Sequence, residues 1–223
     1  MATETISSAD VTSLNRILDD KARIEYSTTI AKLFELAPDM MARKIAEANV
    51  QQAFVFDAVQ FFASSLSSPK ILCVGSYEDT AAASLKQIGF QFKEIDPAIN
   101  YDLNKFFRKW STRKGSYDIV FSTSVLEHVQ NDEQFIQQIA QLLAPGGTAI
   151  LTCDFNDQYK AGDKIPAEDC RFYTQKDFKE RLLPLMKDCD FVGTPNWDCQ
   201  SPDFSYGGCS YTFATLVFQK SRK

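Results

Sequence analysis

Four short apolar runs, each followed by a turn, recur between residues 70 and 153, and their spacing constrains the fold more than any other feature. They predict strands at residues 71–74, 91–95, 118–122 and 148–153. Helix-like stretches follow the first and third runs, at residues 80–89 and 132–143. Strands that alternate with helices build parallel βαβ units with right-handed crossovers. We therefore predict an α/β fold with a Rossmann-like, doubly wound sheet.

The C-terminal part of the chain is expected to close this sheet. A polar loop runs from residue 154 to about residue 173, and residues 175–186 predict a helix. Apolar runs at residues 191–197 and 211–218 predict two closing strands, with a loop rich in aromatic residues and glycine between them. The sheet should therefore be mostly parallel, with an antiparallel C-terminal strand.

Apolar residues ahead of residue 67 fall at helical spacing and predict helices before the sheet. Asp10 can cap a helix that reaches Lys32, Pro38 can begin a second helix, and residues 48–66 predict a third. We expect residues 1–66 to form a helical cap or packing layer on a domain of residues 67–223. A lid over the site and a homodimer contact are the alternative uses of this layer.

Composition and charge exclude several classes of function. A net charge of −5 and a pI near 5.0 give no overall basic footprint for nucleic acid or an anionic membrane, and no apolar run approaches eighteen residues. The six cysteines include no Cys-x-x-Cys pair, which indicates a reduced, cytoplasmic setting. With a single histidine in the chain, we expect no structural metal.

The first strand ends at Gly75, where a tight turn leads into a helix. Such a turn can offer backbone N–H groups to an anionic group, and glycine leaves room for a ligand. A dinucleotide site needs further glycines, whereas here Ser76, Tyr77, Glu78 and Asp79 follow. Two acids would repel a pyrophosphate, so the turn favours a cationic or zwitterionic ligand. The alternative is a plain strand–helix connection.

Asp96 ends the second predicted strand, 21 positions after Gly75. A carboxylate at this place can accept hydrogen bonds from both hydroxyls of a ribose. The alternative is a turn or capping role ahead of Pro97. Because the Gly75 turn lies upstream, we favour ribose binding.

Gly75, Asp96, the segment 117–129 and the turn Ala144-Pro-Gly-Gly147 follow one another in an ordered set. In these motifs the chain resembles the class I S-adenosylmethionine-dependent methyltransferases, over about residues 70–153. The resemblance implies S-adenosyl-L-methionine as the cofactor. It places the cofactor on a group of eight residues: Gly75, Ser76, Tyr77, Asp96, Asp102, Leu103, Ser122 and Ser124.

Within that resemblance, Asp96 would bind the ribose, and Asp102 with Leu103 would lie at the adenine. Ser122 and Ser124 would line the methionine end. Two departures from the family pattern stand out. Cys73 occupies the place of an acid that usually binds the ammonium group, for which Glu78 or Asp79 is a substitute. The link from Asp96 to Asp102 is short, so we expect no crossover helix there.

The implied reaction is in-line methyl transfer, with the hydroxyl of a small molecule or sugar as the acceptor. A hydroxyl nucleophile benefits from a base within hydrogen-bond reach. His128, beside Glu127 and just after the third predicted strand, is the candidate base, and Asp154 is the alternative. A packed or capping histidine is the structural interpretation. Because Ser124 stands where a further acid would be needed, we expect no catalytic metal.

Two other functions stay open. The incomplete glycine turn is compatible with a non-catalytic, methyltransferase-like binding or dimerisation module. An aminopropyl transferase would also hold an adenosine ligand, but the pair of aspartates expected to bind a polyamine is not evident in the sequence.

Overall fold

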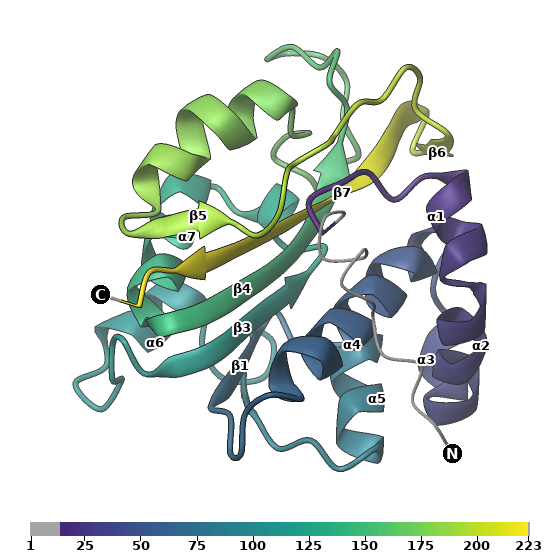
Figure 1. Cartoon of the computed structure of the whole chain (residues 1–223). Coiled ribbons are helices and arrows are strands. Elements are labelled where there is room, and N and C mark those ends of the chain that lie inside the picture. Colours follow the sequence, from purple (N-terminus) through teal and green to yellow (C-terminus); the bar gives the residue numbers. More distant parts are fainter. Residues whose placement is uncertain (1–13, 223) are drawn as a thin grey trace.

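The computed structural model of the chain describes residues 14–222, which form one mixed sheet with helices on both faces (Figure 1). In this part of the chain the sheet has seven strands in the order β2-β1-β3-β4-β7-β5, and β6 pairs with β7. The parallel strands are β1 (Ile71–Val74), β2 (Lys93–Ile95), β3 (Tyr117–Thr123) and β4 (Leu143–Phe155). The antiparallel pairings involve β5 (Cys189–Phe191), β6 (Phe204–Tyr206) and β7 (Cys209–Lys220). The predicted fold class is confirmed.

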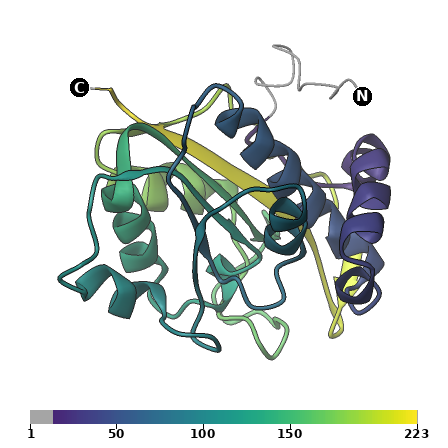
Figure 2. The ribbon, with the colours of Figure 1, turned by 90° about the horizontal axis from the view of Figure 1, so that it is seen from below.

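Helices cover both faces of the sheet, as the view from below shows (Figure 2). One layer contains α1 (Asp20–Glu25), α2 (Ser27–Leu36), α3 (Pro38–Met41), the 3₁₀ turn η2 (Ala46–Ala48), α4 (Asn49–Ala63) and α5 (Thr80–Gln87). The other layer contains α6 (Leu103–Arg108), the 3₁₀ turn η3 (Leu126–His128), α7 (Asp132–Leu142), the π-helix η4 (Asp177–Leu182) and the 3₁₀ turn η5 (Leu183–Leu185). Among residues 14–222, none of these helices has the length and apolar character needed to span a bilayer.

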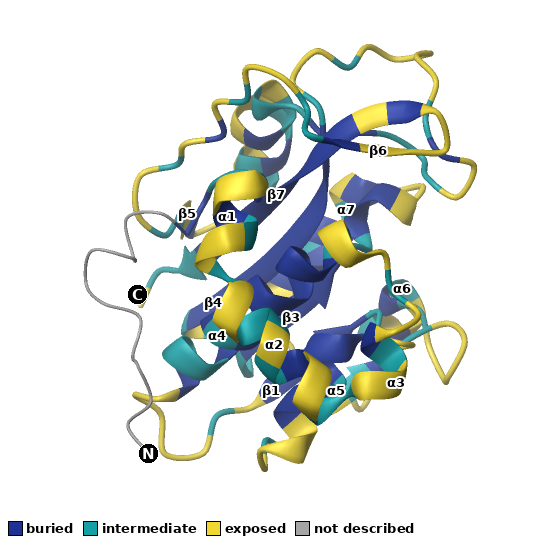
Figure 3. Cartoon of the chain, turned by 90° about the vertical axis from the view of Figure 1, so that its right-hand side faces the viewer, coloured by how far each residue is buried: buried dark blue, intermediate teal, exposed yellow. Residues whose placement is uncertain are grey.

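Alternating side chains of the central strands divide the interior into two cores. In β1, Ile71 and Cys73 pack with α4 and α5, whereas Leu72 and Val74 pack toward α6 and α7. Strands that are buried on both faces read as continuous apolar runs, which explains why β1 was predicted from sequence with its bounds. In Figure 3 the outward faces of α1 and α2 are exposed, while the strands behind them are buried.

The predicted helix from Asp10 to Lys32 is wrong over its first part. Asp10 lies outside the described residues, and residues 14–18 are extended along β7 instead of helical. Helix begins only at α1, where Asp19 accepts a hydrogen bond from the amide of Ala22 at 3.1 Å. The apolar spacing that suggested one helix belongs to two different elements.

A buried asparagine holds this extended segment against β7. The Asn15 side chain accepts from the Val217 amide at 2.7 Å and donates to the Val217 and Val192 carbonyls, both at 2.9 Å. Leu18 N then donates to Phe213 O at 2.7 Å. The segment therefore covers the edge of β7 that lies beyond the reach of the short β5.

Two further predictions are corrected by the structure. A short helix, α6, occupies the crossover where we expected none, and Asp102 caps it by accepting from Lys105 N at 2.7 Å. The predicted strand at residues 191–197 ends at Phe191. Trp197 is instead buried, and its indole N–H donates to Thr215 O at 2.9 Å. The domain boundary after residue 66 stays a prediction.

Candidate functional site

A cavity of about 720 Å³ opens at the carboxyl ends of β1, β2 and β3. Parallel α/β sheets bind ligands at this edge, because the strand order changes direction there. Seven of the predicted site residues line it: Gly75, Tyr77, Asp96, Asp102, Leu103, Ser124 and His128. The other four, Ser76, Ser122, Glu127 and Asp154, are buried behind its wall.

Gly75 forms a turn that no other residue could form without rearrangement. Its φ is +81°, and a Cβ placed there would lie 2.3 Å from Val125 Cγ2. The amides of Gly75 and Ser76 both donate to Ile95 O, at 2.8 and 3.3 Å. The amide of Tyr77 donates to Asp96 Oδ2 at 3.2 Å. The expectation that these amides are free for an anionic group is therefore wrong, because the turn folds back onto β2.

Asp79 presents a buried carboxylate oxygen to the cavity. Its Oδ1 caps α5 by accepting from Ala82 N at 2.7 Å, and among the described residues its Oδ2 has no hydrogen-bond partner. Burial raises the pKa of Asp79 above its usual value; the hydrogen bond from the Ala82 amide and the nearby Thr123 hydroxyl oppose this, and the charge of Lys44, another lining residue, opposes it less. An ammonium group in the cavity would satisfy the unpaired oxygen.

Asp96 and Asp102 also line the cavity. Asp96 Oδ1 accepts from Ala98 N at 2.7 Å, which fixes the carboxylate at the end of β2. Asp102 is engaged at the N-terminus of α6, where the amide and then the side chain of Lys105 hold its pKa below the usual value. Each Asp96 oxygen accepts one backbone amide and keeps a further lone pair for a ligand hydroxyl, and Leu103 supplies an apolar neighbour.

His128, on η3, directs one ring nitrogen away from the cavity. Its Nδ1 lies 3.0 Å from both Glu168 O and Asp169 Oδ1. Both partners are acceptors, so Nδ1 carries a hydrogen and Nε2 is left for the cavity. The hydrogen bond to Asp169 raises the pKa of His128 to about 9, against the effect of burial. At neutral pH the free protein therefore holds an imidazolium.

Three buried carboxyl groups, Glu127, Asp154 and Asp169, lie behind the cavity wall; we call them the acid cluster. Burial raises the pKa of both Glu127 and Asp154, and the charge of Glu127 raises that of Asp154 further. Glu127 Oε1 accepts from Ser124 Oγ at 2.6 Å. Two lining side chains, Ser124 and His128, are thus each backed by a buried carboxyl group.

Ser124 has an unusual backbone conformation within this arrangement. Its φ is +52°, in the left-handed region that serine rarely adopts. The amide donates to Thr152 O at 3.2 Å and lies 3.1 Å from Thr152 Oγ1, on the neighbouring strand. Strain of this kind persists where surrounding structure holds it, and it often accompanies a functional site.

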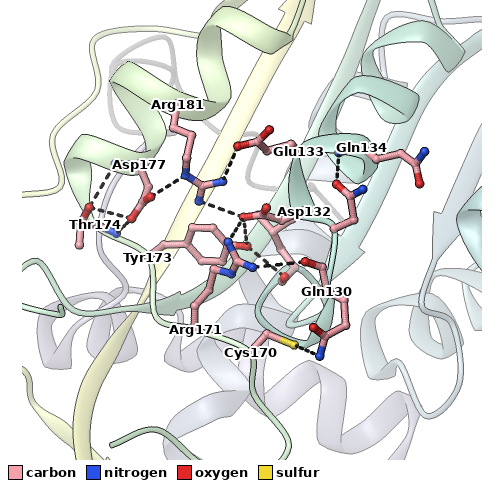
Figure 4. Close-up of polar contacts among 12 residues, drawn as sticks. Gln130, Asp132, Glu133, Gln134, Cys170, Arg171, Tyr173, Thr174, Asp177 and Arg181 are labelled. Carbon is pink, nitrogen blue, oxygen red and sulfur yellow. Dashed lines mark hydrogen bonds and ion pairs between the residues drawn. The ribbon is translucent and has the colours of Figure 1, made fainter. Parts of the chain in front are cut away.

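A second polar network fixes the loop that carries Asp169 (Figure 4). Asp132, at the start of α7, accepts from Tyr173 Oη at 2.9 Å, Arg171 Nη1 at 3.1 Å and Arg181 Nη2 at 2.9 Å. Arg181 also binds Asp177, with Nε 2.8 Å from Oδ1. We call this group the Asp132 network. It ties the segment that follows the acid cluster to the helix that follows His128.

Two residues that the fold brings to the site were not predicted from the sequence. Asp169 lies 41 positions from His128 in the polar loop at residues 154–173, which we expected to recognise the acceptor, but no motif distinguished Asp169 within it. Lys44 reaches the cavity from the N-terminal helical layer. Among residues 14–222, no group of three or more His, Cys, Asp and Glu side chains is arranged to hold a metal ion.

Comparison with known proteins agrees with this arrangement. A family model described as a methyltransferase domain matches residues 46–185, more than half of the chain. The chain belongs to this family. The predicted membership of the class I S-adenosylmethionine-dependent methyltransferases is confirmed.

Individual relatives are more distant. The chain is 27% identical over 121 residues to a ubiquinone biosynthesis O-methyltransferase of Rickettsia typhi. This match covers 47% of the chain and 48% of the relative, so the chain spans about half the length of the curated relative it matches.

Solved methyltransferase structures share the fold at low identity. The 1,6-didemethyltoxoflavin-N1-methyltransferase of Burkholderia thailandensis, solved with S-adenosylhomocysteine, has a TM-score of 0.52 at 15% identity, covering 91% of this chain and 89% of that one. The CurJ carbon methyltransferase has a TM-score of 0.55 at 13% identity, covering 91% and 68%. The cyclase SpnF has a TM-score of 0.53 at 13% identity, covering 90% and 96%. These likenesses show the fold alone, and they do not fix the reaction.

Proposed function

We propose that this protein uses S-adenosyl-L-methionine to methylate a hydroxyl group of a small molecule or sugar. One observation carries the proposal. A single cavity at the strand ends combines Asp96, the unpaired Asp79 oxygen and a histidine backed by a carboxylate. The family match and a relative named as an O-methyltransferase support it.

The residues of the cavity fit this cofactor. Asp96 would accept the ribose hydroxyls, and Asp79 would accept the ammonium group that Cys73 cannot bind. The occupied amides of the Gly75 turn suit a ligand without phosphate. Leu103 would lie against the adenine, with Asp102 beside it and Ser124 toward the methionine end. Bound in this way, the cofactor would supply a methyl group on a sulfonium centre.

His128 is the proposed base, with Asp169 as its positioning residue. For transfer to oxygen, His128 Nε2 must accept the hydroxyl proton, which requires the neutral ring. A cation in the same cavity disfavours the imidazolium, so loading the site lowers the pKa of His128 toward neutrality. Because Glu127 and Asp154 do not line the cavity, we propose that they act from behind Ser124 and His128.

The setting and assembly of the protein remain proposals. All six cysteines lie among the described residues and are free, which supports a reduced cytoplasmic compartment. On the N-terminal helices, Ile24 of α1 and Phe34 of α2 are exposed apolar side chains. They are where a homodimer contact would form.

A non-catalytic binding module is the second candidate. The absence of later glycines from the turn and the occupied amides favour it. Calorimetric titration with S-adenosylmethionine and S-adenosylhomocysteine tests both. The enzyme requires binding, which Asp96→Ala and Asp79→Asn should each weaken at least tenfold. Asp190→Ala, on the exposed side of β5, is the matched control and should bind as the wild type does. No binding at millimolar ligand would exclude the enzyme.

The single histidine allows a direct test of the proposed base. Proton NMR titration should give a pKa of about 9 for His128 in the free protein. S-adenosylhomocysteine, which lacks the sulfonium charge, should change this pKa less than S-adenosylmethionine, which should lower it. Equal shifts of the His128 pKa with both ligands would show that His128 does not lie near the methyl-donating end of the cavity.

A further inference from the structure

Helix α6 and the loop that follows it differ in charge from the rest of the chain. Between Asp102 and Asp118 the sequence holds five lysine and arginine residues and no acid, in a chain with a net charge of −5. Figure 1 shows this loop projecting at the end of the sheet where β1 and β3 begin, opposite the carboxyl ends that form the cavity. The overall charge therefore conceals a local basic surface.

Trp110 projects from this loop into solvent. Its side chain is 98% exposed, against 75% or less for every other exposed large apolar side chain among the described residues. Single exposed apolar residues are common, but a tryptophan without contacts gains nothing for the stability of the fold. Its exposure points to a role outside the folded chain.

Arg108, Arg113 and Lys114 lie within four positions of Trp110, and Lys70 and Lys93 share a cleft with Arg113. We define the basic end patch as Trp110 with Lys70, Lys93, Arg108, Arg113 and Lys114. In the described part of the chain none of these five cations lies within 4.0 Å of a carboxylate, unlike Lys105, which pairs with Asp102 at 3.2 Å. Lys114 Nζ lies 4.0 Å from the centre of the Phe107 ring. The positive charge of the patch is therefore not neutralised internally.

Three of these cations share a shallow cleft of about 540 Å³ at the same end of the sheet. Lys70, Lys93 and Arg113 line it together with Ser111 and Ser116. Asp118, at the start of β3, accepts from the Lys70 amide at 2.8 Å. The cleft thus offers ammonium, guanidinium and hydroxyl donors, which are the groups that bind a phosphate diester.

We propose that the basic end patch docks the protein on an anionic lipid surface, independently of the proposed methyl transfer. Tryptophan favours the headgroup level of a bilayer, where its ring is partly apolar and its N–H is hydrated. A bilayer presents its charge as a plane, and screening limits that field to about 10 Å. A basic patch at one end of the protein is therefore enough for docking, although the rest of the chain is acidic.

A protein partner fits this surface less well. Protein interfaces have an apolar core depleted of charged residues, with cations at the rim. Here one exposed tryptophan accompanies five cations, and the aromatic side chains that line the cleft, Phe92 and Tyr117, are partly buried. The arrangement matches the interfacial layer of a membrane, where basic side chains meet phosphates and a ring enters between headgroups.

Sedimentation with lipid vesicles tests the proposal on the full chain. Vesicles of phosphatidylcholine with 30% phosphatidylserine should bind the protein, and pure phosphatidylcholine should bind it far more weakly. Each cation near an anionic bilayer strengthens binding about fivefold. The triple variant Arg108→Gln, Arg113→Gln and Lys114→Gln should therefore bind on the order of 100-fold more weakly.

A matched control removes the same charge elsewhere. The triple variant Lys21→Gln, Lys176→Gln and Lys187→Gln changes exposed lysines outside the patch and should bind as the wild type does. The chain has two tryptophans, and Trp197 is buried, so a blue shift of fluorescence on vesicle addition reports Trp110. Trp110→Ala should abolish this shift and weaken binding.

Three results would overturn the proposal. The first is absence of binding to the anionic vesicles at low salt. The second is equal binding by the patch variant and the control variant. The third is binding of a single-stranded oligonucleotide more tightly than the vesicles, which would assign the patch to nucleic acid.

Discussion

The buried carboxylate of Asp132 and the acid cluster, whose member Glu127 precedes it by five positions, are compensated very differently. Asp132 is bound by Arg171, Arg181 and Tyr173 (Figure 4). The acid cluster has one basic partner, His128, and two of its oxygens, Glu127 Oε2 and Asp169 Oδ2, lack hydrogen-bond partners among the described residues. The Asp132 carboxylate is thus compensated by two guanidinium groups, whereas the three carboxyl groups of the acid cluster share one imidazole.

The difference separates fold from function in this protein. A buried charge with full compensation holds elements in place, and breaking it leaves unpaired charges behind. Crowded carboxyl groups with too few partners cost stability, and burial raises the pKa of two members here, Glu127 and Asp154. The acid cluster has this second character, and it is the group that backs the cavity. Three substitutions test this difference between the Asp132 network and the acid cluster.

Asp132→Ala should produce the largest loss of stability. It removes the shared partner of Arg171 and Arg181, and such a loss costs about 3–5 kcal/mol in a buried pair. Urea unfolding followed by circular dichroism measures the change. Asp190→Ala, on an exposed strand edge, should cost less than about 0.5 kcal/mol. Equal losses in the two variants would contradict the structural role of the Asp132 network.

Asp169→Asn should lower the pKa of His128, and it should cost less unfolding free energy than Asp132→Ala. Without the carboxylate, the pKa of His128 should fall from about 9 toward its usual value of 6.5. Stability from a raised histidine pKa is present in full below pH 6.5 and is lost as the pH rises through 9. The variant should therefore lose stability mainly below pH 9. An NMR titration that stays at the wild-type pKa would place the origin of the shift elsewhere.

Glu127→Gln should change the unfolding free energy least, and it should remove an unfavourable contribution instead of a favourable one. The raised pKa values of Glu127 and Asp154 mean that the folded protein binds protons that the unfolded chain has released. Stability must then fall as the pH rises from the usual carboxyl pKa through the raised values. Glutamine keeps the bond from Ser124 and removes the charge, so unfolding free energy should depend less on pH. A steeper dependence would contradict this account.

Those parts of the fold that depend on local pattern could be predicted from the sequence. β1 and α7 follow from an apolar run and a helical spacing with a cap, and Asn131 caps α7 by accepting from Gln134 N at 3.0 Å. Residues 14–18 could not be predicted, because the hydrogen bonds of Asn15 reach partners about 200 positions away. Local spacing carries no information about such pairs.

The same distinction applies to the site. Gly75 and Asp96 line the cavity because strand ends and turns leave a local signature. Asp169 could not be found, because its role depends on the loop that the Asp132 network holds against α7. Asp154 was expected just after a strand, but it lies within β4, paired with Phe213 of β7, and its side chain is buried behind the wall. Sequence gives the strand end and not the direction in which a side chain there is packed.

The extended segment at residues 14–18 has a consequence for aggregation. An uncovered strand edge is a template for strands of other molecules. β7 pairs with β5 over only its last residues, so without this segment Phe213 O, Thr215 N and Val217 N would lose their partners. Asn15 and its neighbours occupy these groups. A chain in which this segment is detached should form intermolecular β-structure on warming while its cavity is still intact.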